Sequence, residues 1–248
     1  MKPALLIALL LGTLNLCPAE PATASRINAS STNRVVPSEN NSDVVAISRQ
    51  HWDDRVRVFN EQNLACRNVV LVGDSITEGF DVAKYFPGHR VLNRGISADV
   101  IGNGLPADDH RGVLRRLDSS FFYSAATDVF LLIGINDLGN GHNVEQLEQG
   151  YREILQRLHA TTPSMRIHVE SVLPTRGDYA KHNASVREFN ERLRKLAAEF
   201  GCDYQDLHRL MVDEQGELKA EFTTDGVHLN DQAYLVWRAE IFKAMAWN

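Results

Sequence analysis

The stretch Asn68-Val69-Val70-Leu71-Val72-Gly73-Asp74-Ser75-Ile76-Thr77 decides the fold of this chain. The residues from Val69 to Val72 are continuously apolar, which is typical of a strand in a parallel sheet that is covered on both faces. The glycine, aspartate and serine that follow open a helix-like segment, and serine is a frequent helix cap. The sequence therefore predicts a strand that turns into a helix at Ser75, as in an α/β fold.

Strand-like and helix-like segments alternate along the rest of the chain. Strands are expected at residues 89–92, 128–133, 166–172 and 203–207, and helices near residues 144–161, 179–200 and 231–246. Such alternation is typical of parallel strands joined by helices that cover both faces of the sheet. We therefore expect an α/β fold: a three-layer α/β/α sandwich with a five-stranded parallel flavodoxin-like sheet.

An amphipathic helix is expected ahead of the first strand, between residues 43 and 65. Its apolar residues are spaced to share one helix face. They are Val45, Trp52, Val56 and Phe59. Ile47 falls outside this stripe. We expect the striped face to pack on the sheet.

The amino terminus has the order of a targeting segment. Lys2 is followed by an apolar run over residues 4–16 and by the small-residue site Ala22-Thr23-Ala24. This order predicts a signal peptide over residues 1–24, with a cut after Ala19 as the other option. The apolar run is too short to span a bilayer comfortably, and no second run of that length follows. We expect an exported protein, periplasmic or secreted, with no stable membrane insertion after the signal is removed.

Two further readings concern the segments around that signal. Cys17 permits a lipid anchor, but Leu14-Asn15-Leu16 lacks the small residue expected before a lipidated cysteine. Residues 25–43 are rich in Ser, Asn and Thr and read as a flexible tether. Because the alternation of strands and helices is continuous after the tether, residues 44–248 are expected to form one domain.

The composition is that of an ordinary soluble protein with a sizeable core. The chain has 248 residues, of which 44% are hydrophobic and 23% are charged, with a net charge of -6. That charge argues against a nucleic-acid partner, because there is no basic stripe to release counterions. The most basic stretch, residues 111–116, is flanked by Asp108, Asp109 and Asp118 and is expected to be a solvated helix face.

The cysteines and histidines do not suggest a metal site. Cys66 and Cys202 would remain after signal cleavage, and each precedes a strand that a flavodoxin-like order separates, so unpaired thiols are favoured and a disulfide stays open. No cluster has zinc-like spacing, and we expect neither a metal nor a cofactor.

Three residues could supply the parts of a nucleophilic site. Ser75 lies where the N–H groups at a helix start converge, and the helix dipole there favours negative charge. Asp225-Gly226-Val227-His228 stands just before the last helix. A hydroxyl becomes a useful nucleophile when a base takes its proton, and the base needs a third group to orient it. Ser75, His228 and Asp225 fit these roles, whereas the other histidines lack such a context and are mostly expected at the surface.

Two more motifs follow expected strands. Asn93-Arg94-Gly95-Ile96-Ser97 comes after the second strand and Gly134-Ile135-Asn136-Asp137 after the third. Open parallel sheets bind ligands at the carboxyl ends of their strands. A glycine lets its backbone N–H approach a substrate, and an asparagine amide donates without charge. With the Ser75 N–H, Gly95 and Asn136 would form a three-donor oxyanion hole, while Asp74 and Asp137 are expected to be structural.

These motifs together resemble the SGNH hydrolases, also called the GDSL esterase/lipase family. The four letters stand as Ser75, Gly95, Asn136 and His228, in the family's order, and the resemblance covers roughly residues 66–246. The first motif reads GDSI in place of GDSL. Asn93-Arg94-Gly95-Ile96 and Leu173-Pro174-Thr175-Arg176 are similar to bacterial single-domain esterases related to platelet-activating-factor acetylhydrolase catalytic subunits and to carbohydrate O-acetylesterases.

The resemblance implies a serine esterase that hydrolyses short acyl esters, most simply acetyl, on a small molecule or a glycan. No large insertion that would build a long acyl tunnel is evident. Two alternatives stay open: a lysophospholipase or thioesterase acting on longer acyl chains, and a catalytically silent carbohydrate-binding protein on the same fold. Four residues after the nucleophile could border a pocket or serve the core or surface. They are Phe80, Asp81, Lys84 and Tyr85. A G-x-S-x-G elbow and a P-loop are absent from the sequence, which argues against those two classes.

Overall fold

Five parallel strands form the central sheet. The computed structural model describes residues 41–63, 68–106 and 108–247. The strands are β1 (Asn68–Gly73), β2 (Val91–Gly95), β3 (Ala126–Leu132), β4 (Arg166–Glu170) and β5 (Asp203–Gln205). They lie in the order β2-β1-β3-β4-β5, and every neighbouring pair is parallel. The predicted five-stranded flavodoxin-like sheet is therefore confirmed.

The chain divides into two units, Met1–Ser38 and Glu39–Asn248, and all described residues belong to the second. The predicted signal peptide over residues 1–24 and most of the predicted tether over residues 25–43 lie outside the described residues. Helix α1 (Asn41–Gln62) begins within the last residues that the sequence assigned to the tether. Among the described residues, no helix combines the length and the apolar content that crossing a bilayer requires.

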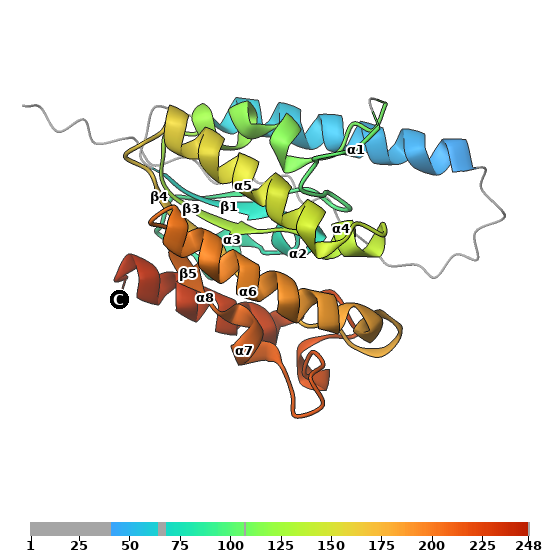
Figure 1. Ribbon diagram of the computed structural model, residues 1–248. Coiled ribbons are helices and arrows are strands. Elements are labelled where there is room, and N and C mark those ends of the chain that lie inside the picture. The colour runs from blue at the N-terminus through green and yellow to red at the C-terminus, as the bar shows by residue number, and fades with distance from the viewer. Residues whose placement is uncertain (1–40, 64–67, 107, 248) are drawn as a thin grey trace, which may run out of the picture. The chain divides into compact units, whose positions relative to one another are not determined.

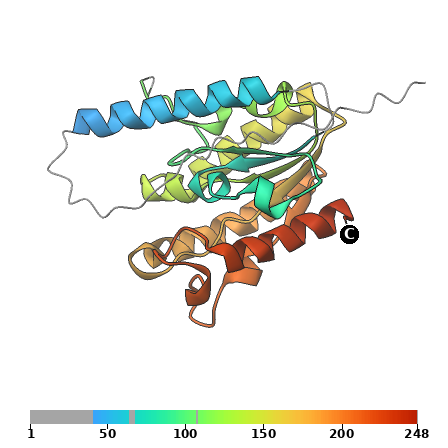
Figure 2. The ribbon, with the colours of Figure 1, turned by 180° about the vertical axis from the view of Figure 1, so that it is seen from behind.

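Helices cover both faces of the sheet, which makes three layers. Figure 1 views the face covered by α5 (Val144–Thr161) and α6 (Asn183–Glu199). Figure 2, from behind, views the face covered by α8 (Asp231–Met245) with the short α2 (Ser75–Glu78) and α3 (Val82–Tyr85). Shorter elements complete the unit: η1 (Val113–Arg115), the π-helix η2 (Asp118–Phe122), α4 (Ile135–Gly139), η3 (Gly177–His182), α7 (Leu207–Met211) and η4 (Ala220–Phe222).

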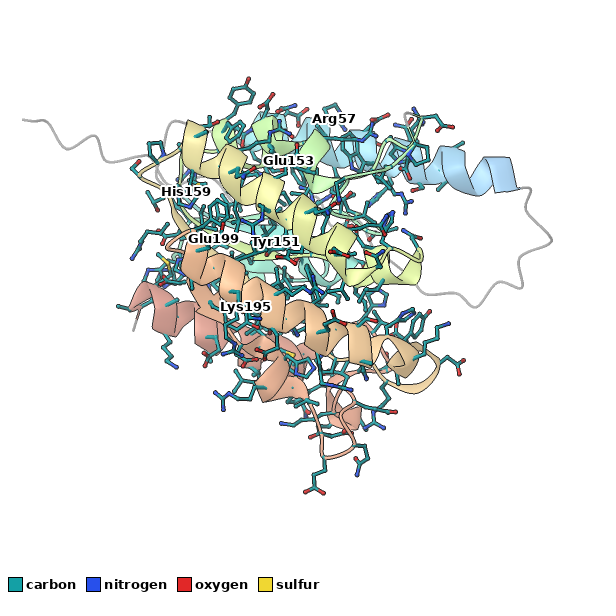
Figure 3. The ribbon with its side chains drawn as sticks, in the orientation of Figure 1. Arg57, Tyr151, Glu153, His159, Lys195 and Glu199 are labelled. Carbon is teal, nitrogen blue, oxygen red and sulfur yellow. The ribbon has the colours of Figure 1, made fainter. Side chains whose placement is uncertain are left out.

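The core lies between the sheet and these helices. Every residue of β1 is buried, as is the run from Asp128 to Leu132 in β3, so the strands are covered on both faces as their apolar sequence predicts. On one face Tyr151 of α5 donates from its hydroxyl to the carbonyl of Leu131 at 2.8 Å (Figure 3). On the other face the Phe80 ring packs at a tilt against Trp237 of α8, with ring centroids 4.8 Å apart.

Several element bounds differ from the sequence prediction. β2 was expected at residues 89–92 but runs from Val91 to Gly95, so Gly95 ends the strand and does not follow it. β5 was expected at residues 203–207 but stops at Gln205, because the side chain of Asp206 caps α7 by accepting from the N–H of Arg209. The helix expected at 179–200 starts as the 3₁₀ turn η3 and becomes α-helical at Asn183.

Helix α1 packs beside β2 and η2 through the predicted face. Phe59 is fully buried and Trp52 and Val56 are half-buried, while Ile47 is 62% exposed. The Phe59 ring has the Arg94 guanidinium 4.7 Å from its centroid and that of Arg116 at 5.7 Å. The amphipathic stripe therefore meets arginine side chains that cover its aromatic ring.

Residues 111–116 are not the solvated helix face that their charge suggested. Arg116 is buried and its Nε donates to the buried Asp99 at 2.8 Å. Arg111 pairs with Asp109 at 2.8 Å. The sequence pattern failed here because the partner that neutralises Arg116 lies in a separate segment and becomes adjacent only in the fold.

Two other predictions concern the histidines and the cysteines. His168 is an exception among the histidines that were mostly expected at the surface. It is buried, stacks on Phe130 with centroids 4.2 Å apart, and its Nε2 lies 3.1 Å from Asp128 Oδ1. Cys202 carries a free, half-buried thiol, whereas Cys66 lies outside the described residues. Burial raises the pKa of the Cys202 thiol to about 11, so the group stays protonated at neutral pH.

Candidate active site

Ser75 lies at the junction that the sequence predicts. β1 ends at Gly73, Asp74 is the N-cap, and Ser75 is the first residue of α2. The Asp74 carboxylate accepts the N–H of Ile76 at 3.0 Å, which fixes the turn and confirms its structural role. The Ser75 N–H is one of the donors that the first helical turn leaves without an intrahelical acceptor.

His228 and Asp225 meet Ser75 from the other end of the chain. His228 Nε2 lies 2.9 Å from Ser75 Oγ, and His228 Nδ1 lies 2.6 Å from Asp225 Oδ2. The other Asp225 oxygen accepts the backbone N–H of Val227 at 2.9 Å and of His228 at 2.8 Å. One short loop thus holds the imidazole so that its free nitrogen faces the serine hydroxyl.

The electrostatics of the loop keep Asp225 ionised. Burial alone would raise the pKa of Asp225, but the bonds from the His228 ring and from the N–H groups of Val227 and His228 outweigh it and lower the pKa to about 2. An ionised carboxylate fixes which imidazole nitrogen carries the proton and stabilises the imidazolium that forms when His228 accepts a second one.

The segment Leu173-Pro174-Thr175-Arg176 anchors this loop. The Arg176 N–H donates to the carbonyl of Gly226 at 2.8 Å, and its Nε donates to the carbonyl of Leu218 at 2.6 Å. Its guanidinium also pairs with Asp213 and with Glu217. Gly226 has a φ of 90°, and a Cβ at this position would lie 2.4 Å from the Arg176 carbonyl oxygen, so this close approach requires a glycine.

Asn136 lies on α4 at the carboxyl end of β3, as expected. Its Nδ2 donates to the carbonyl of Asp99 at 2.9 Å, which uses one of its two amide hydrogens. The neighbouring Asp137 accepts the N–H of Ile101 with both oxygens at 3.1 Å, so it holds the 99–101 segment as the sequence suggested. Asn136 is thereby tied to the loop that follows β2.

Gly95, the third expected donor, has its N–H occupied. That N–H donates to Asn93 Oδ1 at 2.8 Å, and Asn93 Nδ2 donates to the carbonyl of Thr77 at 2.7 Å. A Cβ on Gly95 would lie 2.1 Å from the backbone nitrogen of Glu78. The glycine therefore lets β2 pack closely on α2, and in this structure it does not offer a free donor.

Ala98 offers a backbone donor that the sequence analysis did not identify. Its φ is 61°, a conformation that is uncommon for a residue with a Cβ. It is exposed, and its N–H makes no hydrogen bond to the described residues. Its neighbour Asp99 carries the carbonyl that binds Asn136. An alanine carries no sequence signal for a positive φ, so the pattern could not single it out.

A buried group of carboxyls lies beneath these residues. Burial, with a contribution from the charge of Asp99, raises the pKa of Asp74 to about 7 against the bond from Ile76. Burial likewise raises the pKa of Asp137 to about 8 against the bond from Ile101. Burial therefore favours the neutral, protonated form of both carboxyls.

Arg116 joins the segments of the site from below. Its guanidinium donates to Asp99 Oδ2 at 2.8 Å, to the carbonyl of Arg94 at 2.8 Å and to the carbonyl of Gly73 at 3.0 Å. The ends of β1 and β2 and the loop after β2 are therefore held by one buried cation.

The four residues after the nucleophile that could have bordered a pocket instead serve packing or surface pairing. Phe80 is buried, Tyr85 is buried with its hydroxyl 2.7 Å from Asp231 of α8, and Lys84 pairs with the same aspartate at 2.7 Å. Asp81 caps α3 through the N–H of Lys84. They join α3 to α8.

The proposed triad is open to solvent. The side chains of His228 and Asp225 are 52% and 51% exposed. A hollow of about 310 Å³ borders Asp225 and is lined by polar side chains and by Tyr179, itself 50% exposed. Of the three residues Ser75, His228 and Asp225, only Asp225 lines this hollow. No group of His, Cys, Asp and Glu side chains within the described ranges has the arrangement to hold a metal ion.

Solved structures with this fold include several hydrolases. A Streptococcus pneumonia protein described by the name platelet activating factor is 23% identical with a TM-score of 0.71, over 84% of this chain and 100% of that one. A GDSL-like lipase from Bacteroides thetaiotaomicron is 20% identical with a TM-score of 0.64, over 82% and 98%. A catalytic variant of an acetylxylan esterase from Geobacillus stearothermophilus is 13% identical with a TM-score of 0.57, over 75% and 98%.

Curated relatives match over part of their length. The N-acylneuraminate cytidylyltransferase of Streptococcus agalactiae is 23% identical over 177 residues, which are 71% of this chain and 37% of that one. The enzyme of the same name from Escherichia coli is 22% identical over 193 residues, 77% of this chain and 43% of that one. The chain thus spans less than half the length of these relatives.

A family match covers most of the described unit. The model of the GDSL-like Lipase/Acylhydrolase family matches residues 71–236, from within β1 into α8. This stretch contains Ser75, Asn136 and the loop from Asp225 to His228. The chain therefore belongs to the GDSL-like lipase/acylhydrolase family.

Proposed function

We propose that this chain hydrolyses short acyl esters, most simply acetyl esters, through a triad of Ser75, His228 and Asp225. The observation that carries the proposal is the continuous contact from Asp225 Oδ2 to His228 Nδ1 at 2.6 Å and from His228 Nε2 to Ser75 Oγ at 2.9 Å. Nucleophile, base and orienting group are then in hydrogen-bond reach of one another, which is the arrangement that acyl transfer needs.

The reaction follows from these contacts. His228 Nε2 takes the proton of Ser75 as Oγ attacks the ester carbonyl, and Asp225 stabilises the imidazolium. His228 then gives that proton to the leaving alcohol, and the acyl group stays on Ser75. Water attacks the acyl-enzyme with His228 again acting as base, which releases the carboxylic acid and restores the serine.

Three donors would bind the tetrahedral oxyanion. The Ser75 N–H and the second amide hydrogen of Asn136 keep the roles that the sequence suggests. The N–H of Ala98 takes the place expected for Gly95, because the Gly95 N–H already donates to Asn93 at 2.8 Å. Donors placed in advance around the developing charge lower the barrier without reorganising during the reaction.

We propose an acylated carbohydrate as the natural substrate. Support comes from the half-exposed triad and from the hollow of about 310 Å³ beside Asp225, where Tyr179 presents a ring among polar groups. A sugar has both polar edges and apolar faces that such a lining can contact. The name of one relative points the same way, since acetylxylan is a carbohydrate that carries acetyl esters.

The test is acetate release from a panel of acetylated glycans, together with nitrophenyl esters of increasing acyl length. Highest kcat/KM on acetyl esters supports the proposal, and a maximum at long acyl chains would favour a lysophospholipase or thioesterase. Labelling by a fluorophosphonate probe, lost in Ser75→Ala, separates an enzyme from a silent carbohydrate-binding protein. Turnover close to the parent level in a folded Ser75→Ala variant would overturn the triad.

A further inference from the structure

Helix α1 precedes the region of the family match yet reaches the segment that follows β2. The match starts at residue 71, whereas α1 ends at Gln62. Arg55 of α1 donates to the carbonyl of Gly95 from Nη2 at 2.8 Å and from Nε at 3.1 Å. Gly95 ends β2, and Ala98, the proposed oxyanion donor, follows it closely. A helix outside the family region thus holds the base of that segment.

Glu78 contacts the same segment from the other side. It lies on α2, one turn after Ser75, and its Oε2 accepts the N–H of Ser97 at 2.6 Å and the hydroxyl of Ser97 at 2.7 Å. Ser97 is the residue immediately before Ala98. The helix that carries the nucleophile therefore fixes the neighbour of the proposed donor through one carboxylate.

Glu78 links the contact that Arg55 makes with Gly95 to its own contact with Ser97. Its Oε1 lies 3.5 Å from Arg55 Nε and 3.1 Å from His51 Nε2, so two α1 side chains face it. Burial would raise the pKa of Glu78, but the Ser97 bond, the charge of Arg55 and the contacts from His51 outweigh it and hold the pKa below its usual value. An ionised carboxylate accepts both Ser97 bonds as strong, charge-assisted ones.

We propose that His51, Arg55, Glu78 and Ser97 form a clamp through which α1 positions the Ala98 N–H relative to Ser75. Arg55 and Glu78 are then positioning residues for the ester hydrolysis, and the inference rests on the proposed function. Ser97 and Ala98 are both exposed, so packing does not immobilise them. Hydrogen bonds are what hold this segment, and a misplacement of about 1 Å in a site costs on the order of 10²-fold in rate.

The first test compares Glu78→Ala and Arg55→Ala with Arg57→Ala, measuring kcat, KM and melting temperature on nitrophenyl acetate. Arg57 is a matched control on the outer side of α1, 61% exposed and paired with Glu61 (Figure 3). Concentrations of active sites are set by fluorophosphonate titration. We expect the two clamp variants to lower kcat by about 10- to 100-fold with KM within about threefold, and Arg57→Ala to match the parent.

Two further variants separate positioning from folding. Glu78→Gln keeps an oxygen for Ser97 and is expected to recover part of the kcat lost in Glu78→Ala. Ser97→Ala removes only the hydroxyl bond and should lower kcat by a few-fold at an unchanged melting temperature. If Glu78→Ala does not fold, these two variants carry the test. A lowered melting temperature with kcat unchanged in Glu78→Gln and Ser97→Ala would overturn the clamp.

A double-mutant cycle tests whether the clamp acts as a unit. We expect Arg55→Ala combined with Glu78→Ala to lose little more kcat than Glu78→Ala alone, because each substitution breaks the same link. Full additivity of the two losses would overturn the link through Glu78. Failure of the proposed triad would be seen separately, as activity retained in Ser75→Ala.

Discussion

Asp225 contacts His228 twice, through Oδ2 to the ring Nδ1 at 2.6 Å and through Oδ1 to the backbone N–H at 2.8 Å. The carboxylate therefore orients the imidazole and also shapes the loop that carries it. An amide in its place could still accept the backbone N–H. It would lack the charge that stabilises an imidazolium, and it would allow the wrong tautomer.

We expect Asp225→Asn to fold and to lose most of its kcat, since the same change in a serine protease triad costs about 10⁴. His228→Ala should cost at least as much, and the double variant little more than either, because the two residues act as a unit. Steady-state kinetics with fluorophosphonate labelling rates would measure this. A kcat close to that of the parent in Asp225→Asn would show that only Ser75 and His228 are needed for the reaction.

Asn136→Ala should lower kcat much more than it changes KM. The hydrogen bond from the Asn136 amide to the Asp99 carbonyl is lost together with the proposed oxyanion donor, and one such donor is worth about 10²–10³ in rate. Kinetics on nitrophenyl acetate, with the melting temperature measured in parallel, separate the two effects. An effect confined to KM would show that Asn136 contacts only the ground-state substrate.

Tyr179→Ala should distinguish large from small substrates. The ring lines the hollow beside Asp225, and it takes no part in the hydrogen bonds that join Asp225, His228 and Ser75. We expect KM for an acetylated oligosaccharide to rise several-fold, which corresponds roughly to the binding free energy of one aromatic contact. The kcat and KM for nitrophenyl acetate should stay unchanged. Equal effects on both substrates would mean that Tyr179 supports the loop and does not bind a sugar.

The predicted signal peptide gives a direct prediction about the mature chain. Lys2, the apolar run over residues 4–16 and the small residues up to Ala24 predict cleavage between Ala19 and Ser25. Amino-terminal sequencing of the protein from cell fractions would check this. An intact Met1 on the soluble protein would contradict the proposed export.

The triad candidates could be read from the sequence because each belongs to a short local motif. Ser75 follows a buried strand within a few residues, and Asp225 and His228 lie in one loop, so chain proximity already implies spatial proximity. The β2 segment was harder. Whether Gly95 donates to substrate or to Asn93 depends on a side chain that folds back on its own strand, and the positive φ of Ala98 leaves no mark on composition.

Buried charges were the other failure of sequence reasoning. Arg116 belongs to the stretch that was expected to be a solvated helix face, and nothing in the sequence marks Glu170 as buried, because charged groups are rarely buried without a partner. Their partners, Asp99 and Trp237, lie in different elements that only the tertiary fold brings together. Such pairs lie outside the reach of hydrophobic periodicity, which describes one element at a time.

Glu170 leads to a prediction about stability. It lies at the end of β4, and its Oε1 accepts the indole N–H of Trp237 at 2.6 Å, while Oε2 finds no partner among the described residues. Burial raises the pKa of Glu170 from 4.5 to about 8, against the effect of the Trp237 bond. Below pH 4.5 both folded and unfolded chains hold this proton. Between pH 4.5 and about 8 the unfolded chain alone releases it, so rising pH favours unfolding through that window.

Glu170→Gln removes this titration and can keep an oxygen for Trp237. We expect the variant to gain stability relative to the parent as pH rises from about 5 to about 8, by up to about 1.4 kcal/mol for each pH unit in which only the unfolded parent ionises. Urea denaturation at several pH values would measure the difference.

Asp74 and Asp137, whose pKa values are raised to about 7 and about 8, titrate in the same window, so the variant's own stability should still decline with pH. Glu214→Gln, at an exposed position, is the matched control and should stay parallel to the parent. A constant difference between Glu170→Gln and the parent across this range would show that Glu170 ionises alike in both states.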